Sequence, residues 1–465
     1  PNAQSIIQDS FGNIWIGNYR GGIDFISHTQ PLFNTITYKT EKYGHNCNKQ
    51  VWGLWADNNR QIWLGGEGEL GIYKEGKEIE IIPLNQCRLN KQTHISVIHQ
   101  DKHGDLWLGT HKHGVAIYHP DTKRITCIGD DKDGSLDILC FYEDTDGKIW
   151  IGTQSGLYSA YNRELTQEDK INRLLTNKGI RSILRDKNGK LWIGAKGLFL
   201  FDDKGQLFQE LTTEQSFPIR SVNYLMEDSR KRIWVGTNDG ILVFRDASHL
   251  EDYSHYGTKE GLQNTNVRAI QEDHDGTIWL STNAGISRLD EKTKTFYNYN
   301  HYDGVPMGDF MDGSTCISTD GILYFGSQGG ACYFTPGEVN SIRKPAPVTI
   351  TQFSIYDKQT ESKDTEHPLP LTDANIQLPY NQNTFKISFN VLDYAISSQV
   401  EFSYILEGLE NTWYNTQGEK QIIFRNIPPG HYTFKVKTRL RNQEWEKDEA
   451  TLHIRITPPF WLSWY

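Results

Sequence analysis

Several features that would assign a function quickly are missing from this 465-residue sequence. No stretch approaches the roughly 20 consecutive apolar residues that span a bilayer. Lysine and arginine total 48 against 58 aspartate and glutamate residues, and this net charge of −10 argues against a nucleic-acid surface. Methionine occurs only three times, whereas 41 glycines and 12% aromatic residues suit a β-rich protein with many tight turns.

The cysteines show no C-x-x-C spacing, so they resemble neither a zinc ribbon nor a redox pair. Cysteine is among the most buried residue types, and we therefore predict buried free thiols. One or two disulfides are the alternative if the compartment is oxidising. The six positions are Cys47, Cys87, Cys127, Cys140, Cys316 and Cys332.

Catalytic and metal-binding strings are also missing. There is no G-x-S-x-G or H-E-x-x-H string. The sequence does not exclude catalytic carboxylate pairs that only folding would bring together. Two Asp-x-Asp-Gly strings, at 131–134 and 144–147, lack the closing Glu of a calcium loop, and turn chemistry explains them. A histidine group lies on turns and strand ends that should hold the rings apart, so we predict exposed polar residues and no metal: His94, His99, His103, His111 and His113.

What the sequence does have is a tryptophan that returns every 42–48 residues inside nearly the same string. The first copy reads Asp9-Ser-Phe-Gly12-Asn-Ile-Trp15-Ile-Gly17. A period of this size, carried by strand-like segments, predicts the blades of a β-propeller. Later copies place the aromatic residue at Trp63, Trp107, Trp150, Trp192, Trp234, Trp279 and, in an abnormal eighth copy, Tyr324.

One copy predicts one blade of four antiparallel strands, at 180–185, 191–194, 197–201 and 207–211. Between the first two strands, Asp186 to Gly189 forms a reverse turn in which the Asp bonds backbone amides and the Gly takes a positive φ. Arg60 and Lys231 replace that Gly in two copies, and there we expect another turn conformation. The small Gly two residues after the Trp, replaced by Ser281 in the seventh copy, should leave room for an indole or a neighbouring backbone.

The period ends after Pro336, and 340–349 reads as a proline-containing linker. The next 110 residues show short alternating strands, which favours an immunoglobulin-like β-sandwich. The predicted strands are 384–391, 400–406, 421–424, 431–439 and 451–456, with a turn at 427–430. The fold class is therefore all-β, a propeller followed by a sandwich.

The repeats Asp-x-x-Gly-x-Ile-Trp-Ile-Gly-Thr-x-x-Gly-Leu resemble the two-component regulator propeller repeat. The stretch 378–458, with Leu392-Asp-Tyr394, Phe402-Ser-Tyr404, Trp413-Tyr414 and Ile427-Pro-Pro-Gly-His-Tyr432, is similar to the Y_Y_Y domain that follows such propellers. The resemblance implies the periplasmic sensor region of a hybrid two-component system histidine kinase. In that family two seven-bladed propellers and a Y_Y_Y domain precede a membrane helix and cytoplasmic signalling domains.

This family pattern implies a domain layout. Residues 1–30 would be the last blade of a truncated N-terminal propeller, 31–339 a seven-bladed propeller, and 340–465 the Y_Y_Y sandwich, ending in an aromatic-rich membrane edge. We expect Phe33–Tyr38 to supply the outer strand that closes the ring. An eight-bladed ring that uses every copy is the alternative.

Ligands of propellers usually bind on loops at one face, near the central channel. Aromatic stacking on sugar faces and pairing of cations with uronate or sulfate groups would suit an oligosaccharide; ordinary solvated loop residues are the other interpretation. The family's ligand site lies where its two propellers meet. The candidates, on the loops that enter each first strand, are Lys49, Trp52, His94, Asp137, Arg181, Arg220, Asn266, Arg268 and Asp309.

We therefore expect a periplasmic receptor ectodomain, tethered to the inner membrane, that senses a glycan-derived oligosaccharide and signals through the Y_Y_Y domain to a histidine kinase. A homodimer is implied by the resemblance, and no cofactor, metal or nucleic acid is expected. Kinase motifs are absent here, so this segment is not predicted to be an enzyme. The enzyme alternative, a quinoprotein dehydrogenase propeller, would need adjacent cysteines, which the sequence lacks. The binding alternative is a propeller scaffold for another periplasmic protein.

Overall fold

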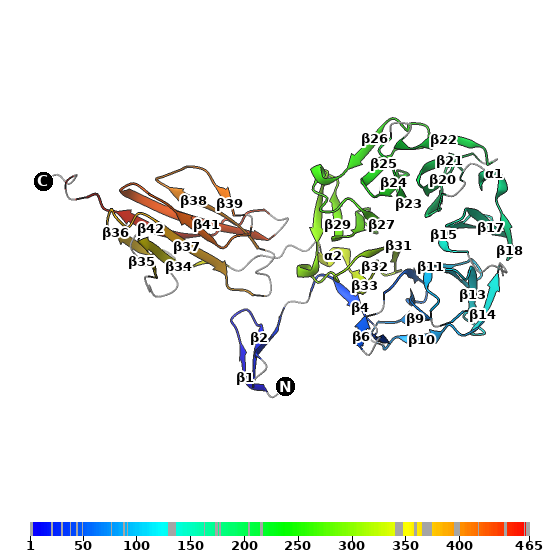
Figure 1. Ribbon diagram of the computed structural model, residues 1–465, viewed down its shortest axis with the longest axis horizontal. Coiled ribbons are helices and arrows are strands. Elements are labelled where there is room, and N and C mark those ends of the chain that lie inside the picture. The colour runs from blue at the N-terminus through cyan, green and yellow to red at the C-terminus, as the bar shows by residue number, and fades with distance from the viewer. Residues whose placement is uncertain are drawn as a thin grey trace. The chain divides into compact units, whose positions relative to one another are not determined.

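The computed structural model divides into two compact units, Pro31–Asn340 and Pro1–Gln30 with Ser341–Tyr465. Strands dominate both (Figure 1). Among the described residues, no helix is long and apolar enough to pass through a bilayer. The structure describes residues 3–19, 22–28, 31–37, 39–42, 45–48, 50–75, 77–86, 89–90, 92–128, 136–161, 163–172, 175, 178–202, 205–213, 217–339, 347–357, 360–364, 374–394, 400–416, 418–440, 444–459 and 461.

The unit Pro31–Asn340 is a propeller of seven four-stranded antiparallel sheets, which we number as blades I to VII. In Figure 1, β11, β15, β23, β27 and β31 surround its centre, and β10, β14, β18, β22 and β26 lie along its rim. The blades are I, β7 (Gly53–Ala56), β8 (Ile62–Gly65), β9 (Glu69–Tyr73), β10 (Glu80–Pro83); II, β11 (Ile95–Gln100), β12 (Leu106–Thr110), β13 (Val115–His119), β14 (Arg124–Ile128); III, β15 (Ile138–Glu143), β16 (Ile149–Thr153), β17 (Leu157–Tyr161), β18 (Glu164–Gln167); IV, β19 (Ser182–Arg185), β20 (Leu191–Ala195), β21 (Gly197–Phe201), β22 (Leu207–Leu211); V, β23 (Val222–Glu227), β24 (Ile233–Thr237), β25 (Gly240–Phe244), β26 (Tyr253–Tyr256); VI, β27 (Val267–Glu272), β28 (Ile278–Thr282), β29 (Gly285–Asp290), β30 (Thr295–Tyr299); and VII, β31 (Phe310–Ile317), β32 (Leu323–Ser327), β33 (Gly330–Phe334), β4 (Asn34–Ile36).

Blade VII is completed by a strand that precedes all the others of the ring in sequence. β4 pairs antiparallel with β33, with Ile36 opposite Ala331, and Ile36 is buried. The predicted closing strand is therefore present and the ring has seven blades. The eight-bladed alternative is wrong, because β31 of blade VII packs directly against β7 of blade I. β1 (Ala3–Gln8), β2 (Ile14–Asn18) and β3 (Gly22–Ile26) form a three-stranded sheet in the other compact unit. Short elements complete this unit: β5 (Lys39–Lys42), β6 (His45–Asn48), α1 (Asp169–Asn172), α2 (Pro336–Val339) and the 3₁₀ turns η2 (Thr258–Glu260) and η3 (His301–Asp303).

The repeated Asp and Trp form a hydrogen bond that recurs in seven copies. In blade IV, Asp186 Oδ1 accepts the backbone N–H groups of Asn188 and Lys190, each at 2.9 Å, as turn chemistry predicts. Its Oδ2 accepts the indole Nε1–H of Trp192 at 2.8 Å. The corresponding indole bonds, 2.5–3.1 Å long, join Asp9 to Trp15, Asp57 to Trp63, Asp101 to Trp107, Asp144 to Trp150, Asp228 to Trp234 and Asp273 to Trp279.

One expectation about the repeat is wrong, and a second holds only in part. Arg60 (φ 60°) and Lys231 (φ 67°) keep the left-handed turn conformation despite their side chains, at a cost of about 1–2 kcal/mol each. The repeat glycine, which is Ser281 in the seventh copy, does not make room for an indole. A Cβ on Gly194 would lie 2.5 Å from the Val222 side chain, so the space is filled by the next blade's inner strand. A neighbouring backbone, the other expectation, does lie close at some copies, for example the Ile180 carbonyl at Gly152.

The residues after 347 form a two-sheet sandwich. One sheet has the order β35 (Thr360–Asp364), β34 (Val348–Asp357), β37 (Phe385–Val391), β40 (Gln421–Phe424). The other has the order β36 (Asn375–Leu378), β42 (Glu449–Ile456), β41 (Gly430–Leu440), β38 (Val400–Glu407), β39 (Tyr414–Asn415), with β36 parallel to β42. The five predicted strands are confirmed. At the predicted 427–430 turn, the Tyr432 hydroxyl donates to the Pro428 carbonyl at 2.8 Å.

The three-stranded sheet of residues 3–26 contacts the sandwich within their common unit. The buried Asn13 side chain donates to Asp393 Oδ1 at 3.4 Å, and the rings of Trp15 and Tyr394 meet edge to face at 5.2 Å. Apolar side chains remain exposed on this sheet, among them Ile6 and Ile23. This sheet therefore lacks the neighbouring blades that cover the sheets of the ring.

Candidate functional site

A channel with a volume of about 410 Å³ runs between the inner strands of the propeller. Its wall is rich in aromatic rings, including Trp52, Trp55, Phe141, Tyr142 and Tyr224. Each inner strand runs from one end of this channel, which we call the entry mouth, to the Asp turns at the other end. Both ends carry charged side chains, among them Arg181 and Asp312 at the entry mouth and Arg185 and Glu227 at the turn end.

The structure separates the nine predicted ligand residues into groups. Trp52 and Arg181 line the channel. Asn266 and Arg268 join a polar network with Arg181, whereas His94 and Asp137 belong to an arc of rings and carboxylates on blades I to III. Arg220 is exposed just before β23, and the carbonyl of Asp309 accepts the N–H of Gln328 at 3.0 Å. Lys49 lies outside the described residues.

The polar network covers blades IV to VII. Arg181 Nη1 donates to Asn223 Oδ1 at 3.1 Å, and Asn223 Nδ2 donates to the side-chain oxygens of Asn238 and Asn266 at 2.8 and 3.1 Å. Asn223 is fully buried, so its bonds fix the position of Arg181. Arg268 Nε donates to Asn283 Oδ1 at 2.7 Å. No motif in the sequence singled out Asn223, Asn238 and Asn283. The Asn223–Asn238 and Arg268–Asn283 bonds each cross one hairpin, whereas the bonds of Asn223 to Arg181 and Asn266 form only when neighbouring blades pack.

Asp312 connects the two arginines and was also missed. Its Oδ1 lies 2.6 Å from Arg268 Nη1, and its Oδ2 lies 3.4 Å from Arg181 Nη1. It lies in an irregular part of β31, where Phe310 pairs with Ser327 but the next pair is Thr315 with Phe325. Gly313 inside a strand was the available signal, because glycine there often marks a bulge.

The arc on blades I to III brings aromatic and imidazole rings together. The rings of Trp52 and His94 are 6.3 Å apart, and those of His94 and His111 are also 6.3 Å apart, all edge to face. His111 Nδ1 lies 3.0 Å from Asp137 Oδ1, and His94 Nε2 lies 3.9 Å from Glu67 Oε1. The expectation that the histidines are held apart is wrong for this pair. No group of three His, Cys, Asp or Glu side chains able to hold a metal occurs in the part of the chain that the structure describes.

His99 lies near the turn end of the channel. Its Nε2 is 3.0 Å from Glu143 Oε2 of the next blade, and its ring meets Trp55 edge to face at 5.0 Å. Burial lowers the pKa of His99, although the hydrogen bond and charge of Glu143 act in the opposite direction. The imidazole is therefore a neutral partner of Glu143 over a wider pH range than a free histidine would be.

None of the described cysteine side chains forms a disulfide: Cys127, Cys140, Cys316 and Cys332. Burial raises the pKa of Cys316 and Cys332, and it raises that of Cys140 to about 12. These three are unreactive as thiolates near neutral pH. Cys127 is exposed, which corrects the prediction of buried thiols for that position. Cys87 and the side chain of Cys47 lie outside the described residues.

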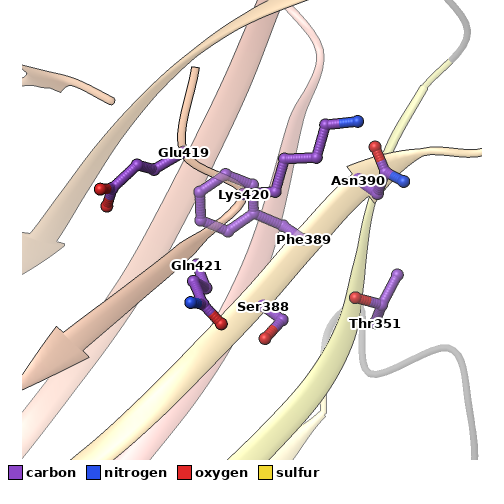
Figure 2. A pocket seen from close by; sticks show the side chains of 7 residues that line it. All are labelled: Thr351, Ser388, Phe389, Asn390, Glu419, Lys420 and Gln421. Atoms are coloured by element: carbon purple, nitrogen blue, oxygen red, sulfur yellow. The ribbon is translucent and has the colours of Figure 1, made fainter. Parts of the chain in front are cut away.

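A second hollow, of about 520 Å³, lies on the sandwich where Thr351 bulges out of the β34–β37 ladder (Figure 2). Ser388 and Asn390 of β37 and Glu419 to Gln421 line the rest of it. The buried Phe389 donates its backbone N–H to the Lys420 carbonyl at 2.9 Å, and this bond joins β37 to the segment Glu419 to Gln421. With its wide opening and no cluster of rings, this hollow is a weaker ligand site than the propeller channel.

Comparisons with known proteins agree with this division of the chain. The family described as two component regulator propeller matches residues 134–155, 174–197, 216–239 and 261–284, and the Y_Y_Y domain matches 393–457. The extracellular domain of a putative hybrid two component system from B. thetaiotaomicron is 37% identical with a TM-score of 0.87, over 98% of this chain and 62% of that one. A second such domain from the same organism is 21% identical over the same shares, with a TM-score of 0.54.

A histidine kinase of Formosa agariphila is 26% identical over 209 residues, which are 44% of this chain and 15% of that protein. The chain thus spans 62% of the similar extracellular domain from B. thetaiotaomicron and a small part of the kinase.

Proposed function

We propose that the chain is the ligand-sensing region of a hybrid two-component receptor, because four of its repeats match the two component regulator propeller and residues 393–457 match the Y_Y_Y domain. Its similarity to the extracellular domain of such a system over 98% of its length supports this. We place the region in the periplasm, as the ectodomain of an inner-membrane protein whose remaining part carries a histidine kinase. The propeller and the Y_Y_Y domain act here in reception and not in catalysis.

The proposed ligand is a glycan-derived oligosaccharide that binds at the entry mouth of the propeller. One observation carries this: Trp52 and Arg181 line the same channel, beside a network of asparagine side chains. Tryptophan offers an apolar face for a sugar ring, asparagine amides suit hydroxyl groups, and arginine pairs with carboxylate or sulfate.

The Y_Y_Y sandwich is the proposed relay between the propeller and the membrane. A relay requires ligand contacts that differ between two arrangements of the receptor. We also propose that the receptor is a homodimer joined through the sandwich. Sedimentation of the ectodomain should then show self-association that rises with concentration; a strict monomer at the highest concentration would contradict the dimer.

The test of the sensing proposal is calorimetry of the complete ectodomain against a panel of oligosaccharides. Binding heat with one glycan would support it if Trp52→Ala abolishes that heat and Tyr302→Ala, a change at an exposed aromatic residue, retains it. No heat with any glycan, together with capture of a periplasmic protein by the propeller, would favour the scaffold alternative.

A further inference from the structure

The irregular segment of β31 reaches over the channel. Residues 311–314 have no register partners in β32, because the ladder resumes only at Thr315. Gly313 takes a left-handed φ of 67°, and a Cβ at this position would lie 3.7 Å from the Tyr224 ring of blade V. Blades V and VII are not neighbours in the ring. The segment therefore extends past blade VI, toward the middle of the entry mouth.

Asp312 at the tip of this segment joins three blades. Its carboxylate lies between Arg268 of blade VI and Arg181 of blade IV, at 2.6 and 3.4 Å. Arg181 and Asp312 both line the channel, and their side chains are 41% and 36% exposed. These ion pairs therefore connect side chains of different blades across the entry mouth, where solvent reaches them.

The two arginines are held without Asp312. Arg181 bonds the fully buried Asn223, and Arg268 donates its Nε–H to Asn283. Each guanidinium therefore keeps its direction when the carboxylate between them leaves. Two fixed cations facing one exposed carboxylate leave the Arg181–Asp312–Arg268 cluster with a net positive charge, and a carboxylate or a sulfate can take bidentate hydrogen bonds from it.

We propose that Asp312 is an internal substitute for an anionic group of the ligand. On binding, a carboxylate or sulfate of an acidic sugar replaces the Asp312 carboxylate between Arg181 and Arg268, and the rest of the sugar enters the aromatic-lined channel. Exchange is inexpensive because an exposed ion pair is weak. The inference rests on the proposed function and deepens it, since it names the ligand class as acidic and assigns specificity to Asp312.

The experiment uses two matched probes, a disaccharide ending in glucuronate and the same disaccharide ending in glucose, titrated by calorimetry into the full chain. In Asp312→Asn the internal competitor is neutral, so the affinity for the glucuronate probe should rise by about threefold to tenfold while the glucose probe stays unchanged. Arg181→Gln should abolish the preference for glucuronate. The matched control is Asp320→Asn, which removes the carboxylate charge from another exposed ion pair, that of Asp320 with Arg60. It should leave both affinities unchanged.

The inference is overturned if Asp312→Asn fails to bind glucuronate more tightly than the wild type, or if it tightens both probes equally. If Asp312→Asn does not fold, Arg268→Lys is a second test. It keeps the positive charge but loses the planar guanidinium that makes bidentate hydrogen bonds. Its affinity for glucuronate should fall and that for glucose should not; equal losses would count against the inference.

Failure of this inference differs from failure of the proposed function. A full-length receptor that responds to a neutral glycan, with unchanged sensitivity in Asp312→Asn, would refute the acidic ligand and keep the sensor. Acid-selective binding in the isolated chain, with a full-length receptor that responds to no glycan, would refute the sensor and keep the site.

Discussion

Replacing Trp192 with Phe tests the hydrogen bond that defines the repeat. Trp192 is fully buried, and its Nε1–H reaches Asp186 Oδ2 at 2.8 Å. Asp186 is only 5% exposed, so water cannot easily replace the lost donor. The other carboxylate oxygen of Asp186 still accepts the amides of Asn188 and Lys190, and the turn should therefore persist.

The expected loss has two parts. Leaving a buried carboxylate oxygen without its donor costs about 1–3 kcal/mol. The smaller ring adds a void, and complete truncation of such a side chain, at about 3–5 kcal/mol, sets the upper limit. We therefore expect Trp192→Phe to lower the free energy of unfolding by roughly 2–4 kcal/mol.

The measurement is urea unfolding followed by circular dichroism, supported by calorimetric Tm values. Trp55→Phe is the matched control, because the Trp55 indole donates to a neutral acceptor, Gln100 Oε1, at 3.4 Å and is only partly buried. This control should cost less than about 1 kcal/mol. If both variants lose equal stability, ring volume alone accounts for the repeat and the Asp–Trp bond contributes nothing.

The remaining predictions concern ring closure, pH and blade spacing. Ile36→Asp puts a charge into the buried contact between blades VII and I and should lower the Tm by many degrees, whereas Ile81→Asp on the exposed outer strand of blade I should change it little. The pKa of folded His99 is lowered by burial, so as pH falls from about 7 the unfolded chain takes up a proton that the folded chain resists, and stability drops. His99→Gln should flatten that drop in Tm between pH 7 and 5, while the exposed control His103→Gln should follow the wild type. Gly194→Ala would place a Cβ 2.5 Å from the Val222 side chain and should cost about 1–3 kcal/mol in urea unfolding, against no measurable change for Gly337→Ala, which meets open space.

Most of the fold could be read from the sequence, because it depends on local, repeated signals. The strand Gly197–Phe201, the outer strand Leu207–Leu211 and the sandwich strand Gln421–Phe424 have the predicted bounds. The aromatic slot of blade VII was recognised although Tyr324 replaces the tryptophan. There Ser318 takes over one role of the repeat Asp, because its Oγ accepts the Ile322 N–H at 3.1 Å.

The candidate site could be predicted only in part. Arg181 and Arg268 were identified because they were expected on loops that enter inner strands; Arg181 directly precedes β19, whereas Arg268 lies inside β27. Nothing local shows that they share Asp312, which is 131 residues from Arg181. The approach of His94 to His111, by contrast, is local: the His111 N–H donates to the His94 carbonyl at 3.0 Å beside the Ile95–Thr110 pair, so the β11–β12 hairpin alone brings the two rings together. Arg60 and Lys231 were misjudged for another reason: the Asp turn bonds in those copies are strong enough to hold a non-glycine residue at positive φ.

The pairing of β4 with β33 has a consequence for synthesis of the chain. Ile36 emerges from the ribosome about three hundred residues before its partner Ala331. The strand β4 therefore has no partner strand while the six blades between them are synthesised. Such a long-range contact is costly in loop entropy and slow to form. Until it forms, the first-made edge strand and the apolar side of blade I are open to wrong partners, and nascent chains would need protection by chaperones.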